Sequence, residues 1–300
     1  MSCIINTMVI SVSIGIMAYN EEKNIGKFLN TLLAQTFQKA IYEIIIISSG
    51  STDDTNKIVE CFSKRDKRIK LIIEKERKGK SSAVNLFLSL AKRNVVILVS
   101  ADLLLEKHTL ENLLKPFKDT DVGIAGCRPI PINDSKKFMG FTSHFLWSLH
   151  HYISLENPKM GEMIAFRKVF KKIPVLSAVD EANIEPLIRG QGYKAVYVPD
   201  AIIYNKGPET IKEFIKSRRR IYFGHLATKS EYSYEVSTFN SIKILSFILK
   251  NFQYSWRFFV WTPAIILLEA YSRLLGMLDY KFKLKDHVIW ETVFTTKQLN

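Results

Sequence analysis

Short apolar runs rich in Val and Ile alternate with segments of helical periodicity over residues 10–99. The runs cover 10–17, 41–47, 69–73 and 95–99, and the segments between them predict helices over 24–33, 53–62 and 81–92. A helix after each strand returns the chain to the same end of the sheet, so successive strands are expected to be parallel. The alternation therefore predicts an α/β fold in which helices cover both faces of a mostly parallel sheet.

Polar clusters stand where several of these strands end. Asn20 and Glu21 follow the first strand, residues 48–54 follow the second, and residues 100–102 follow the fourth. In open α/β sheets the ligand sits beyond the carboxyl ends of the strands, so these clusters predict a catalytic nucleotide site. The sequence contains neither GxGxxG nor GxxxxGK[ST], so the usual dinucleotide and P-loop interpretations lack their phosphate cradle.

The pattern is less regular over residues 129–172. Its histidines, His144, His150 and His151, lack metal-ligand spacing, and we interpret them as mostly structural. Order returns with a predicted helix over 183–189 and predicted strands over 194–198 and 201–204.

The formal net charge of +14 points to an anionic partner. Nucleic acid, a phosphate-bearing substrate and an acidic membrane face are the alternatives, but no nucleic-acid-binding motif is recognisable. The cysteines Cys3, Cys61 and Cys127 are odd in number and form no CxxC, which fits a reducing compartment. The apolar start of the chain has no basic residue before its apolar run, so we interpret it as a buried strand rather than a secretory signal.

Asp102 is the first residue that could perform chemistry. It follows the short apolar run 95–99, where a carboxylate could reach a metal bound to a diphosphate. Mg²⁺ and Mn²⁺ prefer hard oxygen ligands and share carboxylates with substrate phosphates. The structural alternative is a helix N-cap, because Asp is favoured at that position.

Two adjacent carboxylates, Asp180 and Glu181, open the predicted helix over 183–189. One of them could deprotonate an acceptor hydroxyl as a general base. The structural alternative is that both simply complement the helix dipole.

A basic cluster, Arg218 to Arg220, has Lys212 and Lys216 upstream. Arginine binds phosphate oxygens through two parallel hydrogen bonds and could offset the charge of a departing nucleotide diphosphate. The alternative is a solvated basic helix face. A further basic run ends at 77–80, just before a predicted helix, which is a favourable place for phosphate.

Taken in order, several short motifs resemble the family 2 glycosyltransferases, which have the nucleotide-sugar-binding GT-A fold. The motifs are AYNEEKNI, SSGSTDDT, RKGKSSAVN, SAD, GEMIAFRK, DEANIEPLIRGQGYKAVYVPDAIIYNKGPET and SRRRIYFG. Each motif is weak alone, but the ordered set is specific. The resemblance covers residues 10–224, and nothing after that range resembles an element of the nucleotide-sugar site.

The resemblance implies a role for each matching residue. Ala18, Tyr19, Glu21, Ser49, Asp53, Lys80, Ser100 and Ala101 would bind the nucleotide-sugar. Asp102 would bind a divalent metal, Mg²⁺ or Mn²⁺, and Arg219 and Arg220 would lie beside the diphosphate and the acceptor. Glu181 would be the catalytic base, with Asp180 as its rival. The implied enzyme is a metal-dependent, inverting hexosyltransferase that uses a nucleotide-diphosphate sugar. Its acceptor would be a hydroxyl or phosphate group, lipid-linked or on a cell-envelope glycan.

The sequence departs from the family pattern at several positions. Ser48 and Ser49 replace two acids of DDGSTD, and Ser100 replaces the first acid of DAD. The usual ED is DE at 180–181, and QRRRW is SRRRI at 217–221. These changes leave two further interpretations open: a catalytically impaired scaffold that still binds nucleotide-sugar, and a nucleotidyltransferase.

The remaining residues, 226–300, are expected to form a helical region after a catalytic domain of residues 1–225. Apolar stretches over 242–249 and 258–268 are shorter than the roughly 20 residues of a spanning helix. Dense aromatic residues and nearby lysines favour helices that lie in a membrane interface. A single tilted span and a soluble packing element are the alternatives. We therefore expect the protein at the cytoplasmic face of the cell membrane, peripheral or single-span.

Overall fold

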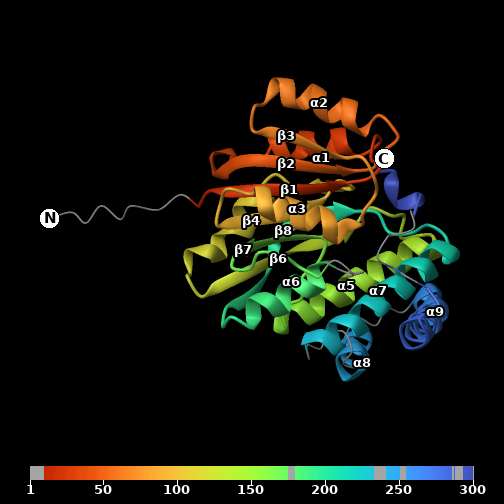
Figure 1. Cartoon of the computed structure of the whole chain (residues 1–300). Helices are drawn as coiled ribbons and strands as arrows, with labels where there is room; N and C mark the ends of the chain where they lie inside the picture. Colours follow the sequence, from red (N-terminus) through yellow and green to blue (C-terminus); the bar gives the residue numbers. More distant parts are fainter. Residues whose placement is uncertain are drawn as a thin grey trace.

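The computed structural model describes residues 10–174, 180–232, 241–250, 255–285, 287 and 293–299. Within these residues, eight strands form one sheet in the order β3-β2-β1-β4-β7-β6-β8-β5 (Figure 1). The strands are β1 (Val12–Ala18), β2 (Ile41–Ser49), β3 (Ile69–Glu74), β4 (Val95–Ser100), β5 (Leu103–Leu105), β6 (Val122–Pro131), β7 (Met163–Arg167) and β8 (Lys194–Asn205). The pairs β1–β2, β1–β4, β2–β3 and β6–β8 are parallel, whereas β7 runs antiparallel to β4 and β6. The predicted α/β fold with a mostly parallel sheet is confirmed.

Helices cover both faces of this sheet. The helices are α1 (Ile25–Leu33), α2 (Thr55–Arg65), α3 (Lys80–Leu90), α4 (Thr109–Leu114), α5 (Phe138–Glu156), α6 (Asp180–Arg189), α7 (Ile211–Tyr232), α8 (Ser241–Lys250) and α9 (Trp256–Phe282). Helices α1, α2 and α4 pack on one face, and α3 and α6 pack on the other. In α1 the buried residues Ile25, Phe28, Leu29 and Leu32 follow helical spacing, so one apolar stripe faces the strands.

The central strand β1 is buried along its whole length. A side chain at Gly15 would collide with the Phe87 ring, because a Cβ there would lie 2.5 Å from that ring. The glycine in mid-strand therefore allows α3 to lie directly on β1. This close packing holds the first residue of α3, Lys80, near the carboxyl end of the sheet.

Residues 129–172, expected to be less regular, contain the 19-residue helix α5 and the strand β7. Helix α5 packs on β6 and also on the helices α8 and α9. Because it has apolar neighbours on more than one side, its sequence lacks the single stripe that marks a surface helix.

The strands predicted over 194–198 and 201–204 are one continuous strand, β8. Its register with β6 shifts between Gly126 and Arg128, where the partner changes from Tyr197 to Ile202. Pro199 and Asp200, which lie between the two predicted strands, form an irregularity within β8 rather than a break between two strands.

The last helices pack against α5 rather than against the sheet (Figure 1). Phe145, Leu149 and Ile153 of α5 form a separate apolar cluster with Phe247 of α8 and with Phe258 and Ile265 of α9. Helix α9 also lies along α7. The helical region expected after residue 225 is present, although the predicted boundary itself falls inside α7.

Candidate active site

A pocket of about 1010 Å³ opens at the carboxyl ends of β1, β2 and β4, and we call it the central pocket. Its other wall is formed by α5, α7 and α9. Of the predicted site residues, Ala18, Tyr19, Glu21, Ser49, Lys80, Ser100, Asp102, Arg219 and Arg220 line it. The fold therefore brings together polar groups that are scattered over 200 positions of the sequence.

Two predicted residues lie outside this lining, and the side chains of two others are not described. Asp53 and Ala101 are not among the described lining residues of the central pocket, and Ala101 is buried in the core beneath the sheet. Asp180 and Glu181 begin helix α6, but their side chains lie outside the described part of the chain. Their catalytic roles stay predictions.

The turn between β1 and α1 is tied to the loop after β2. Asn20 adopts a positive φ of 51°, which asparagine tolerates better than most residues. Its backbone amide donates to Ser51 Oγ at 3.1 Å, and its Oδ1 accepts from the Thr52 amide at 2.8 Å. Both loops thus form one rigid edge of the central pocket.

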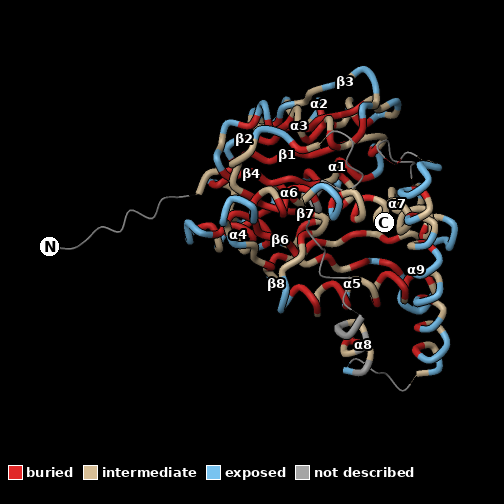
Figure 2. The backbone as a smooth tube through the Cα atoms, turned by 60° about the horizontal axis from the view of Figure 1, so that its bottom comes forward, coloured by how far each residue is buried: buried red, intermediate tan, exposed pale blue. Residues whose placement is uncertain are grey.

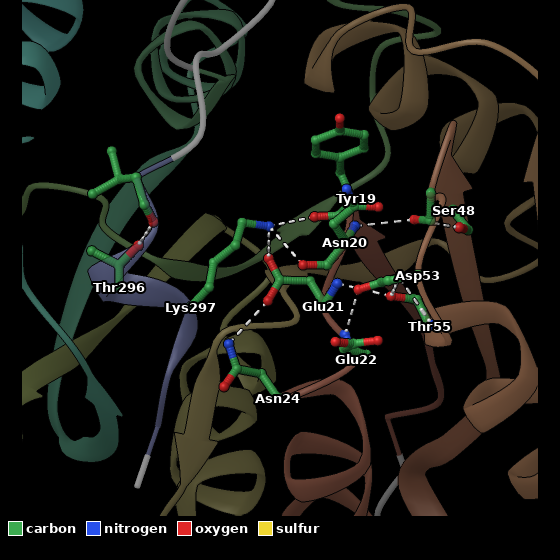
Figure 3. Close-up of polar contacts among 12 residues, drawn as sticks. Tyr19, Asn20, Glu21, Glu22, Asn24, Ser48, Asp53, Thr55, Thr296 and Lys297 are labelled. Carbon is green, nitrogen blue, oxygen red and sulfur yellow. Dashed lines mark hydrogen bonds and ion pairs between the residues drawn. The ribbon is translucent and has the colours of Figure 1, made fainter.

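Asp53 strengthens the same junction. Its carboxylate accepts hydrogen bonds from the amides of Glu22 and Thr55, each at 3.0 Å, and from Thr55 Oγ1 (Figure 3). Burial alone would raise the pKa of Asp53, but these hydrogen bonds lower it below its ordinary value. Asp53 therefore joins the β1–α1 turn to the first residue of α2, whereas a contact with the nucleotide stays a prediction.

Tyr19 presents an aromatic face to the central pocket. The Arg77 guanidinium lies 3.8 Å from the centre of its ring, within the range of a cation–π interaction. Gly50 allows this approach, because it has a positive φ of 69° and a Cβ there would lie 2.8 Å from the Arg77 amide nitrogen. Arg77, Gly79 and Lys80 of the basic run thus line the central pocket, and phosphate binding by this run stays a prediction.

Glu21 is a buried carboxylate in the wall of this pocket, with 6% of its surface exposed. Its Oε2 accepts a hydrogen bond from Asn24 Nδ2 at 3.0 Å, and its Oε1 accepts one from Lys297 Nζ at 2.6 Å (Figure 3). Burial and the nearby charge of Asp102 raise the pKa of Glu21 to about 7, while Lys297 and Asn24 oppose that rise. Two acidic groups therefore lie close together beside one lysine.

The oxygen atoms around Asp102 suit a hard divalent cation. Asn205, which ends β8 opposite Leu103 of β5, has a buried Oδ1 without a hydrogen-bond partner in the described structure. Its Nδ2 lies 3.4 Å from Glu162 Oε1, and both residues line the central pocket with Asp102. Among the described residues, no three His, Cys, Asp or Glu side chains form a metal-binding group. A bound Mg²⁺ or Mn²⁺ would thus take further oxygen ligands from a substrate diphosphate.

The arginines of α7 join the pocket wall to α9. Arg218 forms a two-point ion pair with Glu269, at 2.6 and 2.7 Å, and Glu269 also accepts from Arg273 at 2.9 Å. Arg219 pairs in the same way with the buried Asp279, at 2.5 Å for each contact. Arg219 and Arg220 line the central pocket, and in this structure the charge of Arg219 is already offset by Asp279. Their contact with the diphosphate and the acceptor stays a prediction.

Of the three histidines of α5, only His150 is a described lining residue of the central pocket. His150 is buried, and burial together with Lys159 lowers its pKa to about 3, so its ring is neutral at physiological pH. His151 Nδ1 lies 2.8 Å from the Tyr197 hydroxyl. These contacts agree with the structural interpretation of both histidines.

Lys297, Asn205 and Glu162 line the pocket although the sequence did not predict them as site residues. The sequence does indicate Asn205, because this polar residue stands at the end of an apolar predicted strand, as Asn20 stands shortly after the first strand. Nothing in the sequence indicates Lys297: it is a lone lysine outside any periodic segment, and only the tertiary structure places it beside Glu21.

Comparison with known proteins agrees with this architecture. The sequence profile of Glycosyl transferase family 2 matches residues 13–179. "Glycosyltransferase AglE" of Haloferax volcanii is 30% identical over 163 residues, which cover 54% of this chain and 50% of that protein. "Probable glycosyltransferase YdaM" of Bacillus subtilis is 25% identical over 275 residues, covering 86% of this chain and 65% of that protein. The chain spans half or less of the length of the first curated relatives it matches.

Solved structures share the fold at low sequence identity. The mannosyltransferase PcManGT from Pyrobaculum calidifontis, in complex with GDP-Man and Mn²⁺, superposes with a TM-score of 0.67 at 19% identity, covering 91% of this chain and 88% of that one. S. aureus TarS 1-349 in complex with UDP-GlcNAc gives a TM-score of 0.52 at 19% identity, covering 93% and 83%. The likeness extends through the helices that follow the sheet and supports the GT-A fold. Because the family profile spans more than half of the chain, this protein belongs to glycosyl transferase family 2.

Proposed function

We propose that this glycosyltransferase moves a hexose from a nucleotide-diphosphate sugar to a hydroxyl or phosphate group of an acceptor, with inversion at the anomeric carbon. The observation that carries the proposal is the central pocket, which joins the carboxyl ends of the parallel strands to the arginines of α7. The nucleotide end would lie at the strands and the acceptor end at α7 and α9. The GDP-Man and UDP-GlcNAc complexes of PcManGT and TarS support a nucleotide-sugar as the substrate.

At the nucleotide end, the residues offer the contacts that such a substrate needs. The Tyr19 ring and the Arg77 guanidinium provide flat faces, and Ser49 and Ser100 provide hydroxyl groups. Lys80 opens helix α3, where backbone N–H groups and the helix dipole favour phosphate oxygens. Together these residues would bind the nucleotide and orient its diphosphate toward Asp102.

Asp102, with Asn205 and Glu162 beside it, would hold a divalent metal against that diphosphate. When bound, the metal supplies positive charge that stabilises the departing nucleoside diphosphate. Arg220 and neighbouring basic residues of the pocket would add to that stabilisation. The Mn²⁺ in the PcManGT complex supports this assignment.

The displacement itself needs a base near the acceptor. The acceptor oxygen would form a bond to the anomeric carbon while the bond from that carbon to the diphosphate oxygen breaks. The proton of the acceptor hydroxyl would pass to Glu181, at the start of α6, with Asp180 as the alternative base. A positioned base typically contributes about 10²–10⁴ in rate.

The acceptor end is proposed to face a membrane on the cytoplasmic side. Helix α9 is the one helix of the described chain that is long and apolar enough to cross a membrane. Ten large apolar side chains of α9 are exposed, and five of them recur at spacings of three, four or seven residues and thus form one outward stripe: Trp256, Val260, Leu267, Tyr271 and Leu274. Figure 2 shows this exposed side along α9. The opposite side carries the buried residues and packs on α7.

An orientation in the membrane interface fits these contacts better than a span. Helix α7, which lies along α9, carries Lys212, Lys216 and the three arginines, and a span would draw these charges toward the bilayer core. An interfacial α9 would keep them at the headgroups. A lipid-linked acceptor would then reach the pocket directly from the membrane surface.

Nucleotide-sugar binding is the direct test. The melting temperature of the purified protein is measured with UDP-Glc, UDP-GlcNAc and GDP-Man, each with and without Mn²⁺. A ligand that binds only the folded state raises that temperature, so at least one sugar should raise it more with Mn²⁺ than without. If none does, the proposed substrate class is wrong.

Two activity assays, one for sugar transfer and one for pyrophosphate release, separate the two alternative functions. Binding without sugar transfer to water or acceptor would support the impaired scaffold. Release of inorganic pyrophosphate from a nucleoside triphosphate and a sugar phosphate would support a nucleotidyltransferase.

A further inference from the structure

Residues 294–299, which we call the strap, border the central pocket and are held by hydrogen bonds on both sides. On one side, the amide and the hydroxyl of Thr295 donate hydrogen bonds to the carboxylate of Glu213 in α7. The hydroxyl oxygen of Thr295 also accepts a hydrogen bond from the Glu209 amide at 3.0 Å. On the other side, the Leu299 amide donates to Asn24 Oδ1 at 3.0 Å, and the Leu299 side chain is completely buried. The strap thus connects the start of α7, which lines the pocket, with the N-terminal end of α1.

Lys297 is the residue of the strap that reaches the nucleotide end (Figure 3). Its Nζ donates to the backbone oxygens of Tyr19 and Asn20 and to Glu21 Oε1. These acceptors belong to three consecutive residues, which form the turn between β1 and α1. Three oxygens match the three N–H groups of an ammonium, so Lys297 fixes this turn with all of its hydrogen bonds.

The positive charge of Lys297 reduces repulsion among negative charges at this position. Glu21 and Asp102 lie close enough for each charge to act on the other, and a nucleotide-sugar would bring a further anionic diphosphate. Without a cation, these negative charges would repel one another in a partly buried site. The ammonium of Lys297 offsets the carboxylate of Glu21 at a distance of 2.6 Å.

The strap also leaves room for a ligand. Val293, Thr296 and Lys297 line the central pocket, which still has a volume of about 1010 Å³ with the strap in place. Small-molecule sites generally measure about 300–1,000 Å³, so the strap borders the pocket without filling it. The side chain of Lys297 is directed to the turn and Glu21 rather than across the pocket (Figure 3).

We propose that Lys297 is a positioning residue of the nucleotide site. The strap then forms part of the wall of that site and does not block it. Lys297 holds Tyr19 and Glu21 where a bound nucleotide would contact them. This inference rests on the proposed function, because it requires that the nucleotide binds beside the β1–α1 turn.

The test measures nucleotide affinity by calorimetry in the full chain, with UDP, GDP, ADP, CDP and dTDP as probes in the presence of Mn²⁺. Lys297→Ala removes the three hydrogen bonds, and Lys297→Arg keeps the charge and the ability to donate. Gln298→Ala is the matched control, because its exposed side chain makes no hydrogen bond in the described structure. The melting temperature of each unliganded variant is measured in parallel.

We expect Lys297→Ala to weaken binding of the preferred nucleotide about ten- to a hundredfold, the range for a hydrogen bond to a charged group. Lys297→Arg should recover part of that loss, and Gln298→Ala should stay within about twofold of wild type. A purely structural strap would lower the melting temperature of Lys297→Ala but leave affinity unchanged, and that result overturns the inference. Tighter binding by Lys297→Ala also overturns it, because it would identify the strap as a competitor. If the wild type binds none of the probes, the proposed function fails, and the inference fails with it.

Discussion

Arg218 of α7 and Glu269 of α9 form a two-point ion pair in the wall of the central pocket, at 2.6 and 2.7 Å. The pair joins a helix that lines the proposed diphosphate and acceptor region to the helix whose outer face is apolar. Both partners are largely shielded from solvent, so screening by water and salt is weak and the geometry of the pair matters. Acceptor binding and membrane contact would thus share one rigid unit of the fold.

Asp102→Ala should abolish the effect of Mn²⁺ on nucleotide affinity. The variant removes a carboxylate of the central pocket that would be the main protein ligand of the metal. Calorimetric titration with and without Mn²⁺ measures the difference. Asp54→Ala is the control, because Asp54 is exposed and pairs with Lys57 outside the pocket. A normal Mn²⁺ dependence in Asp102→Ala would show that the metal binds elsewhere.

Glu181→Gln should keep nucleotide affinity but reduce turnover at least about a hundredfold, as the loss of a general base does. Asp180→Asn is the matched variant at the neighbouring position and should reduce turnover less. Steady-state rates for both variants, compared with nucleotide affinities, separate chemistry from binding. The opposite ranking would assign the base to Asp180.

Glu43→Ala should destabilise the fold by about 2–4 kcal/mol, because it leaves buried donors without their acceptor. The Glu43 carboxylate is almost fully buried in β2 and accepts hydrogen bonds from Ser13 Oγ at 2.8 Å, Lys70 Nζ at 2.7 Å and the Lys92 amide at 2.8 Å. Denaturation by urea at pH 7 measures the free energy of unfolding. An unchanged free energy would contradict the prediction.

Glu43 should also make the stability of the protein depend on pH. Burial would raise the pKa of Glu43, but its hydrogen bonds lower the pKa by more than burial raises it. The pKa of Glu43 in the folded protein therefore lies below the ordinary 4.5. A carboxylate with a lowered folded pKa stabilises the protein fully above its unfolded pKa, and this contribution disappears as the pH falls through the folded pKa. Glu43→Gln should therefore show a smaller loss of stability below about pH 4.5 than wild type. If the free energies of unfolding of Glu43→Gln and wild type fell equally steeply with decreasing pH, Glu43 would not have this role.

Most of the sheet was predictable, because its early elements carry local patterns. Helix α1 keeps one apolar stripe, and β1, β2 and β4 are apolar runs that end in polar clusters. Helix α5 was not predictable in the same way, because it lies between the sheet and α8 and α9 and therefore shows no single stripe. The bend of β8 at Pro199 and Asp200 depends on pairing with β6, which no local pattern contains.

The site was predictable where a motif follows a strand, and unpredictable where the contact is long-range. Ala18, Tyr19, Glu21 and Asp102 line the pocket as expected from their places after β1 and β4. Lys297 reaches Glu21 across 276 positions, and nothing in the local sequence indicates that contact. Deleting everything after residue 241 would therefore remove a pocket residue as well as α9, so membrane binding is better tested with point substitutions.

The last prediction is that charges on the outer face of α9 release the protein from membranes without affecting its nucleotide site. Val260 and Leu267 are 59% and 71% exposed and lie seven residues apart, so both belong to the same stripe. Burying a Val or Leu side chain contributes about 1.5–3 kcal/mol, and a carboxylate at that depth is unfavourable besides. The double variant Val260→Glu/Leu267→Glu should thus bind anionic vesicles at least about tenfold more weakly in co-sedimentation.

Ile73→Glu is the matched control, because Ile73 is 51% exposed on β3, at the far edge of the sheet from β5. It introduces the same kind of charge at a comparable exposure and should leave vesicle binding unchanged. Both variants should keep the nucleotide affinity of wild type, since the substituted residues do not line the central pocket. High salt should release an interfacial helix, whose binding depends partly on lysines near anionic headgroups, whereas a spanning helix would resist it. If wild type ignores anionic vesicles, or if the double variant binds them equally well, α9 is a packing element or a partner-binding helix, and the membrane part of the proposed function is wrong.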